Sequence, residues 1–155
     1  MHDSVLTWLK EQNLSFDKVL EVGSYNVNGS ARTIIQAKEY IGVDAIAGPG
    51  VDLIMNGHDL DFEDETFDCV VSTEAIEHDD KFWLTMDEAG RVLKRGGILV
   101  LTTRGNGFVE HAFPADYWRF LPQSFGVLFK LASCVPHKIE SDPSSPGLFG
   151  IGVKR

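Results

Sequence analysis

Residues 19–30 limit the fold more than any other stretch of the chain. They open with a short apolar run, VLEV, which has the length and composition of a buried parallel strand. The run stops at Gly23, and a helix-like pattern begins at Ser30. A strand, a glycine turn and a helix start let a ligand approach the backbone and meet unpaired N–H groups. We therefore expect a small-molecule site here, with Glu21 near the ligand.

The spacing of the glycines disfavours two common kinds of ligand site. A dinucleotide-binding loop has the pattern G-x-G-x-x-G, but Tyr25 and Asn28 occupy its second and third glycine positions after Gly23. A phosphate-binding P-loop needs Gly-Lys-Ser/Thr, which is absent here as well. An NAD-dependent oxidoreductase is therefore disfavoured. An ordinary strand-to-helix turn is the alternative explanation of this stretch, because such turns also carry Gly and Asn.

Short apolar runs alternate with helix-like patterns along most of the chain. These repeats predict an α/β fold with a parallel, doubly wound sheet that binds ligands at the C-terminal ends of its strands. The expected strands cover residues 19–22, 40–44, 51–55, 67–71, 98–102, 135–140 and 148–153, the last two antiparallel to each other. The expected helices are capped by Asp3 or Ser4 and by Asn28 or Ser30, start at Asp79 or Asp80, and have Pro122 in their first turn, in that order along the chain. The second of them would carry Ala31, Ile34, Ile35 and Ala37, and Gly96-Gly97 would end the third.

Two polar residues follow neighbouring predicted strands. Asp44 lies about 20 residues beyond the glycine turn, where nucleotide-binding sheets carry an acidic residue for the ribose. Adjacent parallel strands end side by side, so Asp44 and Gly23 should open onto one crevice, where a carboxylate can accept from two hydroxyls. Asn56 follows the next strand and could pair with a purine edge. An exposed turn aspartate is the alternative for Asp44.

Two segments could cover this crevice. The connection over residues 104–121 is long and rich in glycine, aromatic residues and histidine, and long loops of this kind are often functional. An aromatic loop packed on the edge of the core is the alternative. The first helix, with Val5, Leu6, Trp8 and Leu9 as its apolar positions, either covers the sheet or forms a lid.

Length, charge and cysteine content limit the class of protein to which the chain can belong. Residues 1–155 are expected to form a single domain with a sizeable core. The net charge of −9 argues against a large nucleic-acid-binding surface. No stretch has the pattern of a signal peptide or a membrane span, and Cys69 and Cys134 lie in apolar surroundings, as buried thiols do. We expect a cytoplasmic protein that binds neither nucleic acid nor a membrane.

Five segments, taken in order, resemble the class I S-adenosylmethionine-dependent methyltransferases, in particular the methyltransferase type 11-like group. The segments are VLEVGSYNVNG, YIGVD, NGHDL, the pair FDCVVS and RVLKRGG with Glu77-His78 between them, and FPADYWRF. The resemblance runs from about Lys18 to Phe125. It implies a Rossmann-like sheet of about seven strands, mostly parallel with an antiparallel C-terminal hairpin, and helices on both faces.

The same resemblance implies S-adenosylmethionine as the cofactor and assigns its contacts. The cofactor-binding residues would be Glu21, Gly23, Ser24, Asp44, Asn56, Gly57, His58, Ser72 and Thr73. The first three lie at the methionine end, Asp44 at the ribose, the next three at the adenine and the last two beside the sulfonium. Tyr25 and Val27 replace the family's later glycines, so the first loop must take a different path.

The expected activity is methyl transfer to a small-molecule acceptor. The cofactor supplies the reactivity, so no catalytic triad is needed. If the acceptor must lose a proton, His78, His111 or Tyr117 could assist, with His78 the best placed. A surface histidine is the alternative. The run from His78 to Asp80 lacks a recognisable metal spacing, so no metal site is expected.

A cofactor-binding pseudoenzyme or interaction module is the main alternative to an enzyme. The chain is short and carries no inserted acceptor domain. Tyr117, Trp118 and Phe120, if exposed, could form a protein interface. The oligomeric state stays open, a homodimer included.

Overall fold

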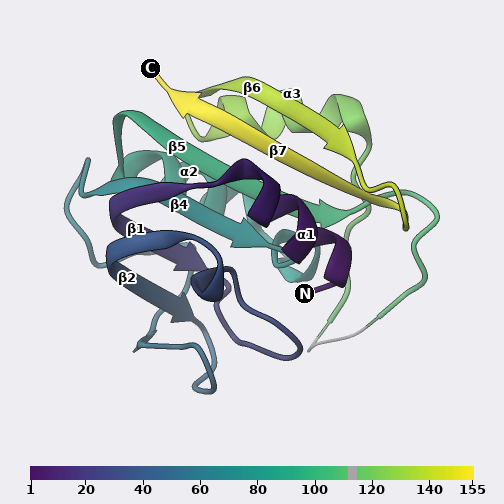
Figure 1. Cartoon of the computed structure of the whole chain (residues 1–155), viewed down its shortest axis with the longest axis horizontal. Helices are drawn as coiled ribbons and strands as arrows, with labels where there is room; N and C mark the ends of the chain where they lie inside the picture. The colour runs from purple at the N-terminus through teal and green to yellow at the C-terminus, as the bar shows by residue number, and fades with distance from the viewer. Residues whose placement is uncertain (112–114) are drawn as a thin grey trace.

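The computed structural model describes residues 1–111 and 115–155. Within these ranges seven strands form one sheet in the order β3-β2-β1-β4-β5-β7-β6 (Figure 1). The strands are β1 (Ser15–Val22), β2 (Gln36–Asp44), β3 (Leu53–Ile54), β4 (Phe67–Thr73), β5 (Leu93–Arg104), β6 (Cys134–Ser141) and β7 (Gly147–Lys154). The helices are α1 (Asp3–Gln12), α2 (Phe82–Val92) and α3 (Pro122–Leu131), with 3₁₀ turns η1 (Ala31–Thr33) and η2 (Ile76–His78).

The pairing of the strands confirms the predicted sheet. β1 pairs in parallel with β2 and β4, while β2 pairs in parallel with β3 and β4 with β5. β7 runs antiparallel to both β5 and β6, which is the predicted C-terminal hairpin. The C-terminal ends of β1, β2 and β4 therefore open at the same edge of the sheet.

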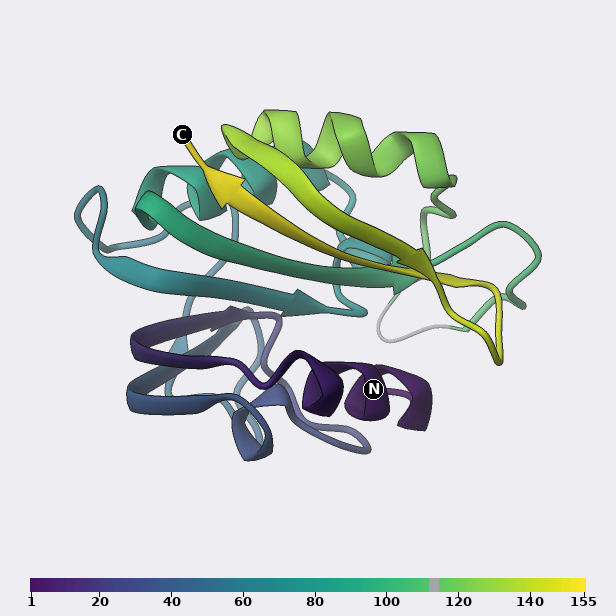
Figure 2. The ribbon, with the colours of Figure 1, turned by 45° about the horizontal axis from the view of Figure 1, so that its top comes forward.

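Helices cover both faces of the sheet, as predicted (Figure 2). On one face α1 buries Val5, Trp8 and Leu9 against residues of β1, β4, β5 and β7. On the other face Met86 of α2 and Phe129 of α3 belong to the larger core cluster. Burying each such side chain contributes about 1.5–3 kcal/mol. Both cysteines are free and buried, as predicted.

The helix predicted after residue 30 is wrong. Ser30 does act as a cap, because its Oγ accepts from the Arg32 amide at 3.2 Å, but only the 3₁₀ turn η1 follows. The chain is extended again from Gln36, so Ala37 lies in β2. Thr33, Ile34 and Ile35 explain the difference, because consecutive β-branched residues disfavour a helix and favour a strand.

The boundaries of the third predicted helix are also wrong. α2 begins at Phe82 and ends at Val92, and Leu93 already pairs with Phe67 of β4. Gly96-Gly97 consequently lies inside β5, where Gly96 has φ +74°, and does not end a helix. Tertiary pairing overrides the local helix signal here.

Smaller differences concern the ends of other elements. His2, and neither Asp3 nor Ser4, is the residue that precedes α1, and Ser4 Oγ instead donates to Asp142 at 2.7 Å. β3 is shorter than predicted because the Val51 amide bonds back to the Gly48 carbonyl in a turn. None of the helices in the described ranges combines the length and apolar character needed to cross a membrane.

Candidate functional site

A cavity of about 570 Å³ lies at the C-terminal ends of β1, β2 and β4. Every residue assigned above to the cofactor lines it: Glu21, Gly23, Ser24, Asp44, Asn56, Gly57, His58, Ser72 and Thr73. The three suggested bases, His78, His111 and Tyr117, line it as well. Its volume is that of an ordinary small-molecule pocket. The structure thus brings together all the residues that the sequence singled out, from six separate stretches of chain.

Glu21 is a buried acidic residue that lines the cavity at the end of β1. Its carboxylate accepts a hydrogen bond from the Tyr40 hydroxyl at 2.8 Å. Burial raises the pKa of Glu21 to about 7, although the Tyr40 hydrogen bond and the nearby Arg32 guanidinium act in the opposite direction. Sheet pairing sets this placement, because Glu21 lies opposite Gly42 of β2, a residue without a side chain. The site therefore holds a carboxyl group that a cationic ligand would ionise.

Asp44 ends β2 beside the first loop and fixes the path of that loop. One carboxylate oxygen accepts from the Tyr25 amide and the other from the Ile46 amide, both at 3.1 Å. An ionised carboxylate can accept about four hydrogen bonds, so Asp44 keeps capacity for two hydroxyls. Asp44 thus fixes the first loop through the Tyr25 amide, at one of the positions where a glycine is missing.

Gly23 is the point where β1 turns into the loop. Its φ of +80° is a left-handed conformation, and a Cβ built there would lie 2.4 Å from Cβ of Ala75. The segment after β4 therefore packs directly against this turn. A side chain at Gly23 would strain the backbone and push the two walls of the cavity apart.

The polar residues after β3 already form hydrogen bonds within the protein. Asn56 Oδ1 accepts from the His58 amide at 2.9 Å, and His58 Nε2 lies 2.6 Å from Oδ1 of Asp79. The other oxygen of Asp79 accepts from Thr85 Oγ1 at 2.5 Å. The His58 ring is thus turned towards Asp79, while Gly57 packs against Val22 and Thr85. These contacts hold Asn56, Gly57 and His58 in place on the cavity wall.

Two buried serine hydroxyls in the cavity wall lack hydrogen-bond partners. Ser24 and Ser72 are 3% and 4% exposed, and neither Oγ has a partner among the described residues. Buried polar groups are almost always hydrogen-bonded in folded proteins, and one left unpaired costs about 1–3 kcal/mol. Both residues line the cavity, so a polar ligand towards which their side chains turn would satisfy the two hydroxyls.

The connection over residues 104–121 covers the cavity, as predicted. Its His111 and Tyr117 line the space, and the Tyr117 amide donates to the Glu77 carbonyl at 2.8 Å. His78 Nδ1 donates to the Ala115 carbonyl at 2.5 Å, and the rings of His78 and His111 lie 4.7 Å apart. Part of the FPADYWRF segment, residues 112–114, lies outside the described residues.

Glu74 and Arg104 were missed by sequence reasoning. Arg104 is fully buried and forms ion pairs with Glu74 and, at 3.3 Å, with Asp142. Glu74 has φ +51°, and its carboxylate also accepts from the amide of His2 at 2.7 Å. His2 lines the cavity, so the start of α1 closes one side of it as well as covering the sheet. The sequence carried one signal for this ion-pair network. Arg104 ends an apolar strand, and a guanidinium buried there needs acidic partners.

The sheet order and the cavity at its switch point define the class, a class I S-adenosylmethionine-dependent methyltransferase fold. The family described as methyltransferase domain matches residues 16–101, more than half of the chain. The chain belongs to this family, and its cofactor is S-adenosylmethionine. A comparison with curated protein sequences finds no match.

Solved structures of the same fold cover nearly the whole chain. A chain of the Haloferax volcanii complex between the Trm112 methyltransferase activator and a methyltransferase has a TM-score of 0.78 and 18% identity, covering 98% of this chain and 89% of that one. The Burkholderia thailandensis 1,6-didemethyltoxoflavin N1-methyltransferase, solved with its substrate and S-adenosylhomocysteine, has a TM-score of 0.74 and 15% identity over 97% and 76%. The [4+2]-cyclase SpnF has a TM-score of 0.73 and 15% identity over 97% and 81%.

Proposed function

We propose that the chain transfers a methyl group from S-adenosylmethionine to a small-molecule acceptor in this cavity. The observation that carries the proposal is the convergence of Glu21, Asp44 and Ser72 on one space, with the buried hydroxyls of Ser24 and Ser72 unpartnered there. Acidic groups suit a cofactor that carries a cationic amino group and a sulfonium. These unpaired hydroxyls are what a polar ligand needs, so the residues fit the cofactor.

Each strand end has a distinct part in binding the cofactor. The carboxylate of Asp44 accepts from the two ribose hydroxyls. Glu21, Gly23 and Ser24 hold the methionine end, where a cationic amino group stabilises ionised Glu21. The adenine lies along Asn56, Gly57 and His58, and the hydroxyls of Ser72 and Thr73 lie beside the sulfonium.

The chain positions the acceptor and takes up its proton. When bound, the cofactor supplies a methyl group that an acceptor lone pair takes as the C–S bond breaks, its electron pair staying on sulfur to give S-adenosylhomocysteine. Burial lowers the pKa of His111, so its imidazole is neutral near pH 7 and can accept a proton. His78 donates from Nδ1 to a carbonyl, which leaves the lone pair of Nε2 available. Tyr117, half exposed at the rim, faces the acceptor.

The acceptor is a small molecule because little of the chain can enclose it. Beyond the cofactor residues, the cavity is bounded by the start of α1 and by the 104–121 connection. The net charge of −9 disfavours a polyanionic acceptor such as nucleic acid. A single domain over residues 1–155, working in the cytoplasm, is part of this proposal.

A cofactor-binding interaction module is the second candidate. Of the three residues expected at such an interface, Tyr117 and Trp118 are 54% and 38% exposed, but Phe120 is buried in the core, so its expected exposure is wrong. Trp83 and Leu121, 42% and 47% exposed, are further apolar side chains at the surface. They would meet a partner protein or a second copy of the chain.

Calorimetric titration with S-adenosylhomocysteine, and with NAD for comparison, tests the proposal. We expect saturable binding of S-adenosylhomocysteine and none of NAD. The acceptor is then sought by incubating the chain with methyl-labelled S-adenosylmethionine and fractionated cell extract. Label in the low-molecular-mass fraction supports the proposal, label in macromolecules contradicts a small acceptor, and binding without transfer to any fraction favours the module.

A further inference from the structure

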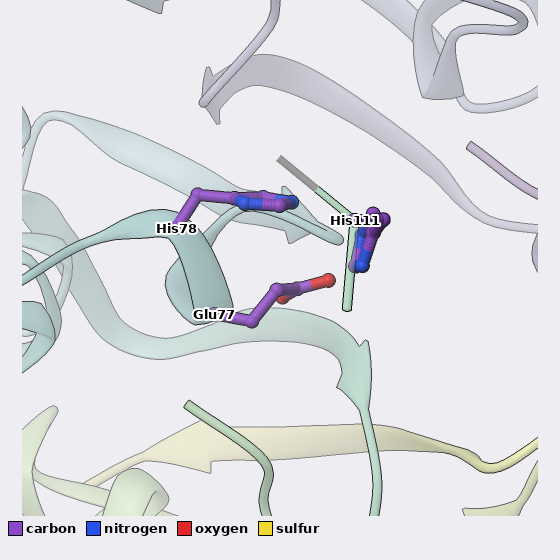
Figure 3. Close-up of side chains that lie close together, drawn as sticks. All are labelled: Glu77, His78 and His111. Atoms are coloured by element: carbon purple, nitrogen blue, oxygen red, sulfur yellow. The ribbon is translucent and has the colours of Figure 1, made fainter. Parts of the chain in front are cut away.

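Three potential metal ligands from distant parts of the sequence meet at the rim of the cavity. Glu77 and His78 belong to η2, just after β4, and His111 belongs to the 104–121 connection. One donor atom from each side chain lies within 4.8 Å of the other two. Figure 3 shows the Glu77 carboxylate directed towards the His111 ring, with the His78 ring beside the same space.

Glu77 carries an unpaired carboxylate oxygen into this cluster. The residue is fully buried, and its Oε2 accepts from Thr103 Oγ1 at 2.7 Å. Its Oε1 is buried without a hydrogen-bond partner among the described residues. Leaving a buried carboxylate oxygen unpaired is costly unless a cation or a proton satisfies it. The unpaired Oε1 of Glu77 therefore belongs to a residue that lies next to the imidazoles of His78 and His111.

One of the two histidines is held in the manner of a metal ligand, and the other carries an unpaired nitrogen. A histidine that binds a metal through one nitrogen usually uses the other to contact a carbonyl or carboxylate, which fixes the ring. His78 Nδ1 donates to the Ala115 carbonyl at 2.5 Å, which leaves the lone pair of Nε2 free. His111 Nδ1 lies 3.2 Å from Oδ2 of Asp116 but makes no hydrogen bond with any described residue. The group thus contains a second buried polar atom, besides Oε1 of Glu77, that a metal ion would satisfy.

We propose that Glu77, His78 and His111 bind a divalent transition-metal ion such as Zn²⁺ or Co²⁺. Two imidazoles and one carboxylate suit these ions, whereas Mg²⁺ and Ca²⁺ prefer oxygen donors throughout. Metal–ligand bonds of about 2.0–2.2 Å set the donor atoms roughly 3–3.5 Å apart, so the three side chains close slightly on the ion. Three protein ligands leave coordination positions open.

The open positions face the proposed cofactor cavity. His78 and His111 line that cavity, while Glu77 lies beneath them. An acceptor with an oxygen donor would therefore bind the ion beside the methyl group, a step that rests on the proposed function. A metal-bound imidazole cannot also accept a proton, so this use of the two histidines replaces their use as bases.

A second group of acids and histidine lies nearby and is less suited to a metal. It consists of His58, Asp79 and Asp80. His58 Nε2 already contacts Asp79, and both oxygens of Asp79 accept hydrogen bonds from Thr85 and the Lys81 amide. Its donors are satisfied within the protein, in contrast to Oε1 of Glu77.

Titration of the metal-stripped full chain with Co²⁺, followed by its absorption spectrum and by calorimetry, tests the proposal. We expect one ion per chain. His111→Ala and Glu77→Gln should each weaken binding at least tenfold, while His137→Ala, an exposed histidine on β6, leaves it unchanged. Circular dichroism confirms folding, and His111→Ala decides the matter should Glu77→Gln not fold. No stoichiometric binding, or a loss with His58→Ala and none with His111→Ala, overturns the site.

Two further measurements keep this proposal separate from the proposed function. S-adenosylhomocysteine is titrated into the metal-stripped chain, so that cofactor binding and Co²⁺ binding succeed or fail independently. Acetohydroxamate, a bidentate oxygen donor, is then added to the Co²⁺-loaded chain. A change in the Co²⁺ spectrum supports open positions on the ion, and an unchanged spectrum contradicts them.

Discussion

The hydroxyl of Tyr40 on β2 donates to the buried carboxyl group of Glu21 on the neighbouring strand β1, at 2.8 Å. The pair joins the two strands at the level where the cavity begins. Among the charged groups near Glu21, Arg32 favours its ionised form and Asp44 opposes it, and the N-terminal ammonium of Met1 also interacts with it. The ionisation of Glu21 therefore reports on both folding and ligand binding.

Stability should fall as the pH rises through the titration of Glu21. Its pKa is about 7 in the folded chain against 4.5 for an unperturbed carboxyl, so the folded state binds the proton more tightly. The stabilisation is complete below about pH 4.5 and is lost as the pH rises to about 7, up to roughly 3 kcal/mol. Urea unfolding at pH 5 and pH 8 measures the difference. Glu21→Gln should remove the share due to Glu21 and leave that of Glu77, whose pKa burial also raises to about 7; an equal pH dependence in the variant would contradict the assignment.

Binding of S-adenosylhomocysteine should tighten over the same range. The ionised form of Glu21 attracts the cationic amino group of the ligand, and more of it is present at pH 8 than at pH 6. Calorimetry at both pH values gives the ratio of dissociation constants. In Glu21→Gln the ratio should approach one, and a retained ratio would place the responsible group elsewhere.

Asp44→Ala should weaken cofactor binding by about 1–3 kcal/mol, through loss of charged hydrogen bonds to the ribose. Asp59→Ala is the matched control, because Asp59 is an exposed aspartate after the neighbouring strand β3 that does not line the cavity. Both variants are compared by calorimetry. Equal affinities would remove Asp44 from the ribose site.

Gly23→Ala should destabilise the fold and impair cofactor binding together. The added methyl group would overlap Ala75, and φ +80° alone costs an alanine about 1–2 kcal/mol. Gly96→Ala separates the two effects, since Gly96 has φ +74° but no atom within 4 Å of a built Cβ. We expect a larger loss of unfolding free energy for Gly23→Ala, and a loss of affinity in that variant alone. Equal losses in stability would mean that the Ala75 contact relaxes freely.

Arg104→Met should cost about 3–5 kcal/mol of unfolding free energy, because it leaves Asp142 as a buried acid without its cation and leaves Glu74 to pair with the N-terminal ammonium group. Arg95→Met, which breaks an exposed ion pair with Glu65, should cost less than about 1 kcal/mol. Urea denaturation compares the two. Similar losses would show that the buried network adds little.

The sequence was informative where one local pattern has one structural outcome. The apolar runs predicted the strands, and the residues after them, Glu21, Asp44 and Asn56, proved to share one cavity because parallel strands end together. Local patterns failed where tertiary pairing decides. Residues 31–37 have apolar positions at helical spacing, yet Gln36 and Ala37 already pair with Ser15 and Phe16 of β1, which leaves room only for the short turn η1. The juxtaposition of Glu77 with His111 depends on how a long connection folds back, which no spacing in the sequence encodes.

The Glu77 carbonyl accepts from the amides of both Tyr117 and Trp118, and the Trp118 indole donates to the Asp79 carbonyl at 2.8 Å. All of these anchors use backbone acceptors just after β4, so they do not depend on the exposed side chains of Asn106, Val109 and Glu110. Those three positions can therefore vary without loosening the attachment, whereas Phe108 packs against His2 and His111 and Gly107 has φ +95°. Substitutions at these few loop positions would therefore change the acceptor of related proteins while their cofactor site stays the same.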